Sequence, residues 1–434
     1  MAGQQRVNRR RGVLAVVIVG ALALAGCTGG AVDPLADLDP VSTVLDEQLA
    51  GELQAVLDEA VALSGSSGGV AGAWSPWSGE WTGATGSVDF GEKPAPVAVD
   101  TQFHLSTLTT EITCTVLLRL VDEGQVWLDD EVAEIVDWVP GLDGITLGQL
   151  CQHTSGIADY FPGLRSHFVA NPERIWPPNE LLSSGLALPR TGPPGEQWAH
   201  SRTGVLLLAM ALERRTGRSW SQLADQYVFA PLGLDHTSLP SPTDTELESG
   251  LGAYSAAIAP DGAVDCAVLR DDSSQSSSMG GAAAGAVSDL DDARRLSAAF
   301  ATGALLDEST ARKQWNAIPL GGDAPAWQGW GLGGAQYGPM RGLAGESAGA
   351  LTAAFTDPKS GLTVVVALNN STSGADFARE AAFALASIAS KAPAVAGHEQ
   401  PLVELPWSIE QATTKMRELA KCPKAEPAAE PAAG

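Results

Sequence analysis

The chain has 434 residues, of which 44% are hydrophobic and 18% are charged. This length suits one large domain or two ordinary ones, with enough apolar residues for a sizeable core. The formal net charge is −25. Because an acidic surface repels phosphates, we expect no nucleic-acid partner and attribute the charge to solubility.

The first 26 residues are expected to be a signal peptide. Four arginines precede the apolar run GVLAVVIVGALALAG, which ends in LAGC at residues 24–27. A basic segment, a short apolar segment and small residues are typical of secretory signals. A cysteine after LAG resembles the lipobox of bacterial lipoproteins, which implies that Cys27 is lipidated and holds the exported chain on the outer face of the cell membrane. A plain signal anchor or an ordinary cleavage site is the alternative.

Residues 27–43 are rich in Gly, Pro and Asp and are expected to form a flexible tether. Residues 44–64 carry leucine, valine and alanine at helical spacing, which predicts an amphipathic helix. The segment GGVAGAWSPWSGEWTGATGSVDF alternates apolar residues with Gly and Pro, which predicts a hairpin.

A helix rich in hydroxyl groups is expected over FHLSTLTTEITCTVLLRLVDEG, residues 103–124. Ser106, Thr107, Thr109 and Thr110 crowd its start, apolar residues follow at helical spacing, and Gly124 ends it. Hydroxyls at a helix start act as caps or as nucleophiles, and a nucleophile needs a base beside it.

Helices and long loops are expected up to about residue 260, including a buried helix over 202–217, and a further helix over 284–301. Strand character returns at 327–370, and a helix follows at 372–391. Strands at both ends with helices between them favour an α/β (α+β) domain over 44–392, in which one sheet draws on both ends of the chain. Beyond it we expect a linker and a helix over 393–421 and a disordered tail over 422–434.

Four cysteines follow the lipobox, at positions 114, 151, 266 and 422. An exported location permits disulfides, and four cysteines allow three pairings. Cys114 lies within an apolar helix face, so a buried free thiol is an equal alternative. The cysteine spacing does not suggest zinc.

Several segments, in order from about residue 45 to 390, resemble the serine β-lactamase and penicillin-binding-protein family, in its class C β-lactamase and D-alanyl-D-alanine carboxypeptidase branch. They are FHLSTLTTEITCTVLLRLVDEGQVWLDDEV, ITLGQLCQHTSGIADY, GVLLLAMALERRTGRSW, FAPLGLDHTSL, AGAVSDLDDARRL and GLTVVVALNNS. The resemblance implies a β-lactamase-like fold, an antiparallel sheet flanked by helices.

The family acylates a serine in an SxxK motif whose lysine lies one helical turn later. Counting back from LVDEG places the serine position at Thr107 and the lysine position at Thr110. A shift of one residue gives Ser106 and Thr109, which also lacks lysine. No lysine occurs between residues 93 and 313, and SxxK is absent from the chain. The register therefore cannot explain the loss.

The family's other two motifs are also altered. The YxN motif falls on WAHSRTG, with His200 at the tyrosine position and Arg202 at the asparagine position. The imidazole of His200 is either a base or a filler of the tyrosine's space. The HxG motif reads Leu343, Ala344, Gly345. Loss of three motifs together indicates that acyl transfer has been lost.

Other patterns compete with this interpretation. GESAG at 345–349 fits a nucleophile elbow around Ser347, but a strand rather than a helix is expected after it. His153, Thr154, Ser155 and Asp159 are close enough to suggest a triad. The remaining histidines show no metal-ligand spacing. Tryptophans 74, 77, 81, 327 and 330 either line a cleft or, as we favour, belong to the core.

We therefore expect an envelope lipoprotein with an inactive domain that binds or scaffolds, needing no cofactor and no metal. Its expected partners are the membrane, through the lipid, and a cell-wall peptide or an envelope protein. The alternative is an active hydrolase, an esterase, peptidase or β-lactamase-like enzyme, rebuilt around Ser106 or Thr107 with His200.

Overall fold

The computed structural model describes residues 33–259 and 262–424. The predicted signal peptide and Cys27 lie outside the described residues. Within the described ranges, no helix is both long and apolar enough to cross a membrane. Part of the predicted tether lies on the domain: Leu35 is only 1% exposed and packs in the core, and Asp39 lies 3.6 Å from the Arg294 guanidinium.

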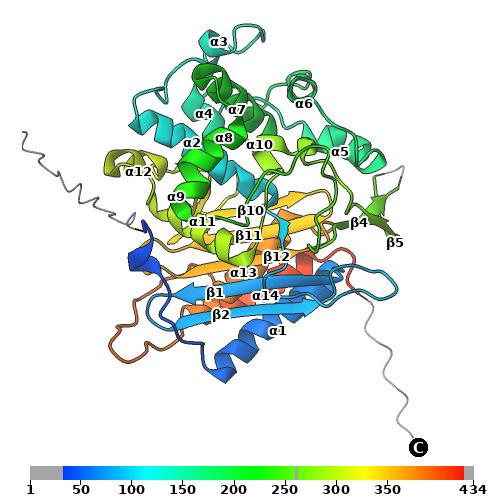
Figure 1. Cartoon of the computed structure of the whole chain (residues 1–434), viewed down its shortest axis with the longest axis vertical. Helices are drawn as coiled ribbons and strands as arrows, with labels where there is room; N and C mark the ends of the chain where they lie inside the picture. Colours follow the sequence, from blue (N-terminus) through cyan, green and yellow to red (C-terminus); the bar gives the residue numbers. More distant parts are fainter. Residues whose placement is uncertain (1–32, 260–261, 425–434) are drawn as a thin grey trace, which may run out of the picture. The chain divides into compact units, whose positions relative to one another are not determined.

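An eight-stranded antiparallel sheet forms the centre of the domain (Figure 1). Its order is β2-β1-β12-β11-β10-β9-β8-β7, so strands from the two ends of the chain meet where Val70 lies opposite Ala367. This confirms the predicted sheet. The strands are β1 (Gly68–Ser75), β2 (Gly79–Gly86), β7 (Ile318–Pro319), β8 (Gln328–Trp330), β9 (Ala335–Tyr337), β10 (Met340–Ser347), β11 (Ala350–Thr356) and β12 (Thr363–Leu368).

Helices cover both faces of the sheet. On one face α1 and α13 pack against the central strands and each other, and α14 packs on α13. On the other face α11 contacts the same strands and α2 packs on it, with the inserted helical region beyond (Figure 1). Every position of β1, β11 and β12 is consequently buried.

The helices have the following bounds: α1 (Glu47–Ser64), α2 (Thr109–Asp122), α3 (Val132–Ile135), α4 (Leu147–Cys151), α5 (Phe161–Ala170), α6 (Pro178–Leu186), α7 (Arg202–Thr216), α8 (Trp220–Ala224), α9 (Ala230–Leu232), α10 (Gly281–Ala284), α11 (Leu290–Thr302), α12 (Glu308–Gln314), α13 (Ala375–Ala389) and α14 (Ile409–Leu419). Two-stranded sheets join β3 (Phe103–His104) to β6 (Val287–Ser288) and β4 (Tyr254–Ile258) to β5 (Val264–Asp271).

Two predicted helices begin later than expected. The segment over 103–124 starts with β3 and a 3-10 turn, Ser106–Leu108, before α2 begins at Thr109. The segment over 284–301 starts with β6, and the Asp289 side chain then caps α11 by accepting a hydrogen bond from the Asp292 amide.

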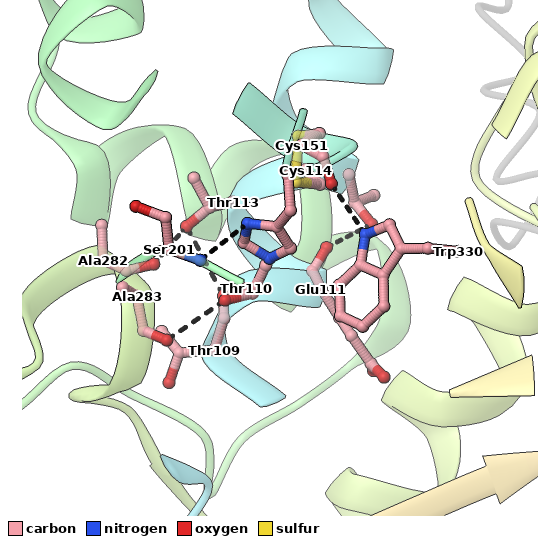
Figure 2. Close-up of a disulfide and its surroundings, with 12 residues drawn as sticks. Thr109, Thr110, Glu111, Thr113, Cys114, Cys151, Ser201, Ala282, Ala283 and Trp330 are labelled. Atoms are coloured by element: carbon pink, nitrogen blue, oxygen red, sulfur yellow. Dashed lines mark hydrogen bonds between the residues drawn. A yellow bond between two sulfur atoms is a disulfide. The ribbon is translucent and has the colours of Figure 1, made fainter. Parts of the chain in front are cut away.

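Two disulfides settle the cysteine pairing, Cys114–Cys151 and Cys266–Cys422. The first joins α2 to α4 in the core, so Cys114 is not a free thiol (Figure 2). The second holds the C-terminal segment against β5. The Lys424 amide also donates to the Ala62 carbonyl, so residues 422–424 are held on the domain rather than forming a free tail. Residues 425–434 lie outside the described part.

Most of the tryptophans named above belong to the core. The indoles at 74, 77, 81 and 330 are buried, and the indole at 327 is half-buried against it.

Candidate functional site

The position where acylation would start lies on the 3-10 turn before α2. Thr107 is 4% exposed, and its hydroxyl donates to the Glu346 carbonyl at 3.4 Å. Thr110, at the lysine position, donates its hydroxyl to the Ala283 carbonyl at 3.2 Å. Both threonines therefore bond to the backbone of neighbouring elements, which fits a packing role, and neither side chain caps α2.

Ser106 is fully buried and adopts a positive φ of 53°. Its hydroxyl lies 3.0 Å from the hydroxyl of Ser347, at the end of β10. Such a backbone conformation is uncommon for a residue other than glycine and is found at functional sites. A pair of neutral hydroxyls nevertheless supplies no base.

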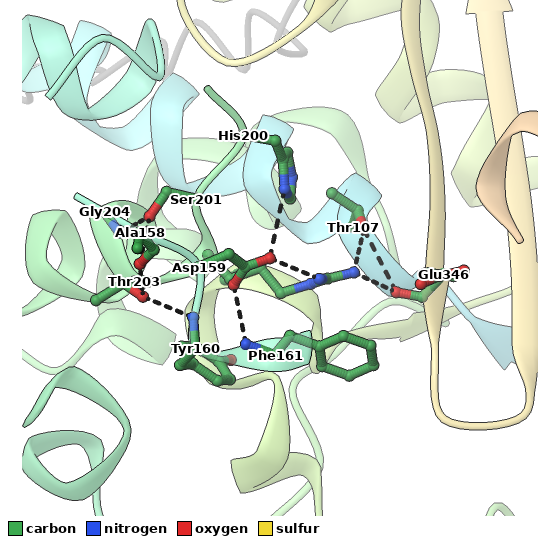
Figure 3. A network of polar contacts seen from close by, with 12 residues as sticks. Thr107, Ala158, Asp159, Tyr160, Phe161, His200, Ser201, Thr203, Gly204 and Glu346 are labelled. Carbon is green, nitrogen blue, oxygen red and sulfur yellow. Dashed lines mark hydrogen bonds and ion pairs between the residues drawn. The ribbon is translucent and has the colours of Figure 1, made fainter. Parts of the chain in front are cut away.

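Arg202 lies beside the nucleophile position, and its partners Thr107, Asp159 and Glu346 are labelled in Figure 3. Its guanidinium lies 3.0 Å from Asp159 Oδ2, donates to the Glu346 carbonyl at 3.0 Å, and donates to the Thr107 hydroxyl at 3.4 Å. It also lies 4.0 Å above the centre of the Phe161 ring. A guanidinium is always protonated in proteins, so the side-chain nitrogen that contacts the Thr107 hydroxyl cannot accept its proton.

The carboxylate of Asp159 neutralises this cation. Its side chain is 13% exposed. Burial raises the pKa of Asp159, but Arg202 and then His200 lower it by more, so the pKa lies well below its usual range. The pair is therefore ionised throughout the neutral pH range.

His200, at the tyrosine position, faces Asp159 rather than the nucleophile. Its Nδ1 lies 3.6 Å from Asp159 Oδ2, and its side chain is 29% exposed. Among the described residues, no histidine hydrogen-bonds to Ser106 or Thr107. The structure thus provides no imidazole in place to activate either hydroxyl.

The third motif lies on β10, where Leu343 is buried. A Cβ on Gly345 would come within 2.4 Å of the Thr107 Cβ, so this glycine allows β10 to approach the turn. GESAG does not form a nucleophile elbow: Ser347 ends β10, and a tight turn leads directly into β11. The cavity bordered by Ser347 holds about 20 Å³, which is room for one water.

The segment around His153 serves structure. His153 Nδ1 accepts from the Ser201 amide at 3.3 Å, and its carbonyl accepts from the Ala199 amide at 2.8 Å. Burial, followed by the charge of His200, lowers its pKa well below the usual range, so the ring is neutral. Ser155 accepts from the Ile157 amide. Asp159 pairs with Arg202, so these residues form no triad.

One group of possible metal ligands occurs in the described part of the chain, formed by His236, Asp289 and Asp292. His236 Nδ1 lies 2.7 Å from Asp289 Oδ2, and Asp292 accepts from the His236 amide and the Thr237 hydroxyl. These bonds join the loop after α9 to the start of α11 and account for the cluster without an ion. No local pattern indicated this cluster, because His236 and the two aspartates come from distant segments.

Two features of the site were missed by sequence reasoning. Phe161 supports the guanidinium, and Glu346 contributes a main-chain carbonyl that no side-chain pattern reveals. A signal for Asp159 did exist. An arginine at the start of an apolar helix must be neutralised if it is buried, and Asp159 is the acid of the adjacent HTSGIADY segment.

The chain is similar to a known protein family, to curated proteins and to solved structures. Residues 61–388 match the Beta-lactamase family. The chain is 33% identical over 151 residues to the D-alanyl-D-alanine-carboxypeptidase/endopeptidase AmpH of Escherichia coli (strain K12), a match covering 33% of this chain and 38% of the relative. The matches to this and the other leading curated relatives span about a third of the relatives' length.

Solved structures are similar over more of the chain. A D-stereospecific amidohydrolase from Streptomyces sp. has a TM-score of 0.63 at 27% identity, over 73% of this chain and 94% of its own. A penicillin binding protein from Bacillus halodurans has a TM-score of 0.61 at 21% identity, over 74% and 95%, which supports the fold alone. The chain belongs to the Beta-lactamase family of penicillin-binding-protein-like serine hydrolases.

Proposed function

We propose that this protein is an exported, lipid-anchored member of the family that no longer catalyses acyl transfer and acts by binding or scaffolding at the cell envelope. The observation that carries the proposal is the place of Arg202. Its guanidinium contacts Thr107, Asp159 and the Glu346 carbonyl, and so occupies the space beside the nucleophile position.

Acyl transfer needs a nucleophile, a base that takes its proton, and space for the substrate carbonyl. Thr107 has a hydroxyl but is nearly buried, and a permanent cation lies beside it. Thr110 cannot replace the lysine as a base, because a threonine hydroxyl remains protonated at neutral pH. Loss of a nucleophile or its base typically lowers the rate by several orders of magnitude.

A rebuilt hydrolase is the second candidate, and the positive φ of Ser106 favours it. In that case Ser106, or Thr107, would be the nucleophile, and His200 would have to turn away from Asp159 to act as the base.

Hydrolysis of a simple aryl ester separates the two candidates. We expect the purified domain to give the same rate as its Thr107→Ala and His200→Ala variants. Thr414→Ala, an exposed position on α14, is the matched control. A rate that disappears in either site variant but persists in Thr414→Ala would establish the rebuilt hydrolase.

The lipid anchor rests on LAGC at residues 24–27. A cell-envelope localisation also agrees with the two disulfides, which form in oxidising compartments. We expect a palmitate analogue fed to expressing bacteria to label the wild-type protein in the membrane fraction and to leave Cys27→Ala unlabelled. Labelling of Cys27→Ala, or export of the wild type without a label, would contradict the anchor.

A further inference from the structure

A cavity of about 210 Å³ lies between β8, α13 and the C-terminal segment that ends in α14. It is lined by Trp327 and Gln328 from the β8 region, Glu380 and Phe383 from α13, and residues from 406 to 415. The family match ends at residue 388, so the part of the wall formed by α14 lies outside it. A water molecule occupies about 30 Å³ of liquid, so this cavity has room for a small organic molecule.

The apolar wall is fixed by packing. The Trp407 ring stacks on Phe383 with centroids 3.8 Å apart, and its Nε1 donates to the Phe383 carbonyl at 3.2 Å. Trp327 packs against Trp407 at 5.7 Å. Three rings held in this way offer a preformed apolar surface that a ligand would not have to organise.

Two opposite charges also line the cavity. Glu380 is 3% exposed, and its Oε1 accepts from Arg379 Nη2 at 2.9 Å and Nε at 3.2 Å. Its second oxygen, Oε2, has no hydrogen-bond donor among the described residues. Lys415 is exposed and forms no ion pair within residues 33–259 and 262–424. Because this oxygen is free of donors from the described residues and is not fully enclosed, it can accept a charge-assisted hydrogen bond from the ammonium group of a ligand in the cavity.

We propose that this cavity binds a small zwitterion with an apolar side chain, the chemical class of the free hydrophobic α-amino acids. The ligand ammonium donates to Glu380 Oε2, its carboxylate faces Lys415, and its side chain packs against Trp327, Phe383 and Trp407. The site uses α13 and α14, which contribute nothing to the Arg202 network, so it is independent of the proposed loss of catalysis.

Isothermal titration calorimetry with three related probes tests this site. L-phenylalanine carries both charges, phenethylamine only the ammonium, and 3-phenylpropionate only the carboxylate. We expect saturable binding of phenylalanine with a Kd of about 1 mM or tighter. Phenethylamine should bind more weakly, and phenylpropionate, which lacks the donor to Glu380, most weakly of the three.

Variants assign the contacts. Lys415→Ala should lower the affinity for phenylalanine about fivefold and leave the affinity for phenethylamine unchanged. Glu380→Gln should lower the affinity for phenylalanine and for phenethylamine by about tenfold each. Ala412 is buried and lines the cavity, so the larger side chain of Ala412→Leu should fill the cavity and abolish binding. This variant provides a second test of the site if Glu380→Gln fails to fold. Glu418→Ala, exposed on α14, is the control. Absence of saturable phenylalanine binding, equal binding of phenylpropionate, or binding unchanged by all three site variants would overturn the proposal.

Discussion

Replacing Arg202 with methionine is expected to destabilise the domain. The Arg202 side chain is 6% exposed, and the Asp159 side chain that faces it is 13% exposed. Methionine keeps the apolar stem on Phe161 but removes the cation that faces Asp159. Among the described residues, the nearly buried carboxylate then keeps only the Phe161 amide, which donates to it at 3.1 Å, and the His200 imidazole, 3.6 Å away. The Arg202 side chain, which lies beside the nucleophile position, is therefore expected to stabilise the fold.

The magnitude follows from the burial of the pair. Removing one partner of a buried ion pair costs about 3–5 kcal/mol, because the other charge is left uncompensated. Roughly 390 residues are described, and an unfolding entropy of about 2.1 cal/mol/K per residue then gives about 0.8 kcal/mol/K. The expected fall in Tm is about 4–6 °C. Removing both charges, in Asp159→Leu with Arg202→Met, should recover most of this loss.

Thermal and urea unfolding of the two single variants and the double variant measure the effect. Arg312→Met is the control, because its ion pair with Glu308 is 65% and 89% exposed and is worth under about 1 kcal/mol. The folded pKa of Asp159 is depressed, so its contribution is present above its unfolded pKa of about 3.9 and is lost as the pH falls further. If Arg202→Met is as stable as Arg312→Met, or if the double variant is less stable than both single variants, the ion pair does not stabilise the fold as expected.

Three other changes test the disulfide at β5, the buried Glu111 of α2 and the close approach of β10 to the nucleophile position. The Cys266–Cys422 bond spans a sequence separation of 156 residues, so its double serine variant should lose about 3–5 kcal/mol in guanidinium unfolding; unchanged stability would contradict this. Burial raises the pKa of Glu111, so the folded protein loses stability as the pH rises above the unfolded pKa of about 4.3. The Glu111→Gln variant should therefore be more stable than the wild type at neutral pH but not below about pH 4. A stability difference that does not depend on pH would contradict this prediction. Gly345→Ala should cost about 1–3 kcal/mol in urea unfolding, because its Cβ would meet the threonine at the nucleophile position at 2.4 Å. In contrast, Gly51→Ala, with no neighbour within 4 Å, should stabilise α1 by about 0.5–1 kcal/mol, and equal effects would argue against the close packing.

The sheet and the loss of the motifs were predictable because short local stretches of sequence indicate both. Apolar runs such as TVVVAL mark buried strands, and a missing lysine needs no structure to be noticed. The motif register assigned Arg202 to the asparagine position, and in the structure its guanidinium lies 3.4 Å from the Thr107 hydroxyl, a contact that the register did not specify.

Long-range pairings were not predictable. Arg202 contacts the Glu346 carbonyl across 144 residues, and nothing local specifies this contact. Its partner Asp159, 43 residues away, was indicated only by the need to neutralise a buried arginine. The hairpin of β4 and β5 was missed because β5 is mostly exposed and shows no alternation of apolar and polar residues. Cys422 was assigned to a free tail because composition carries no information about its covalent bond to Cys266.

The loss of acyl transfer is tested by intact-mass analysis of the mature domain after incubation with a fluorescent penicillin and with a fluorophosphonate. Because Arg202 occupies the space beside Thr107 and no base lies within hydrogen-bond reach of it among the described residues, we expect an unchanged mass with both reagents. A stoichiometric adduct on Ser106, Thr107 or Ser347 would contradict it and establish a working nucleophile.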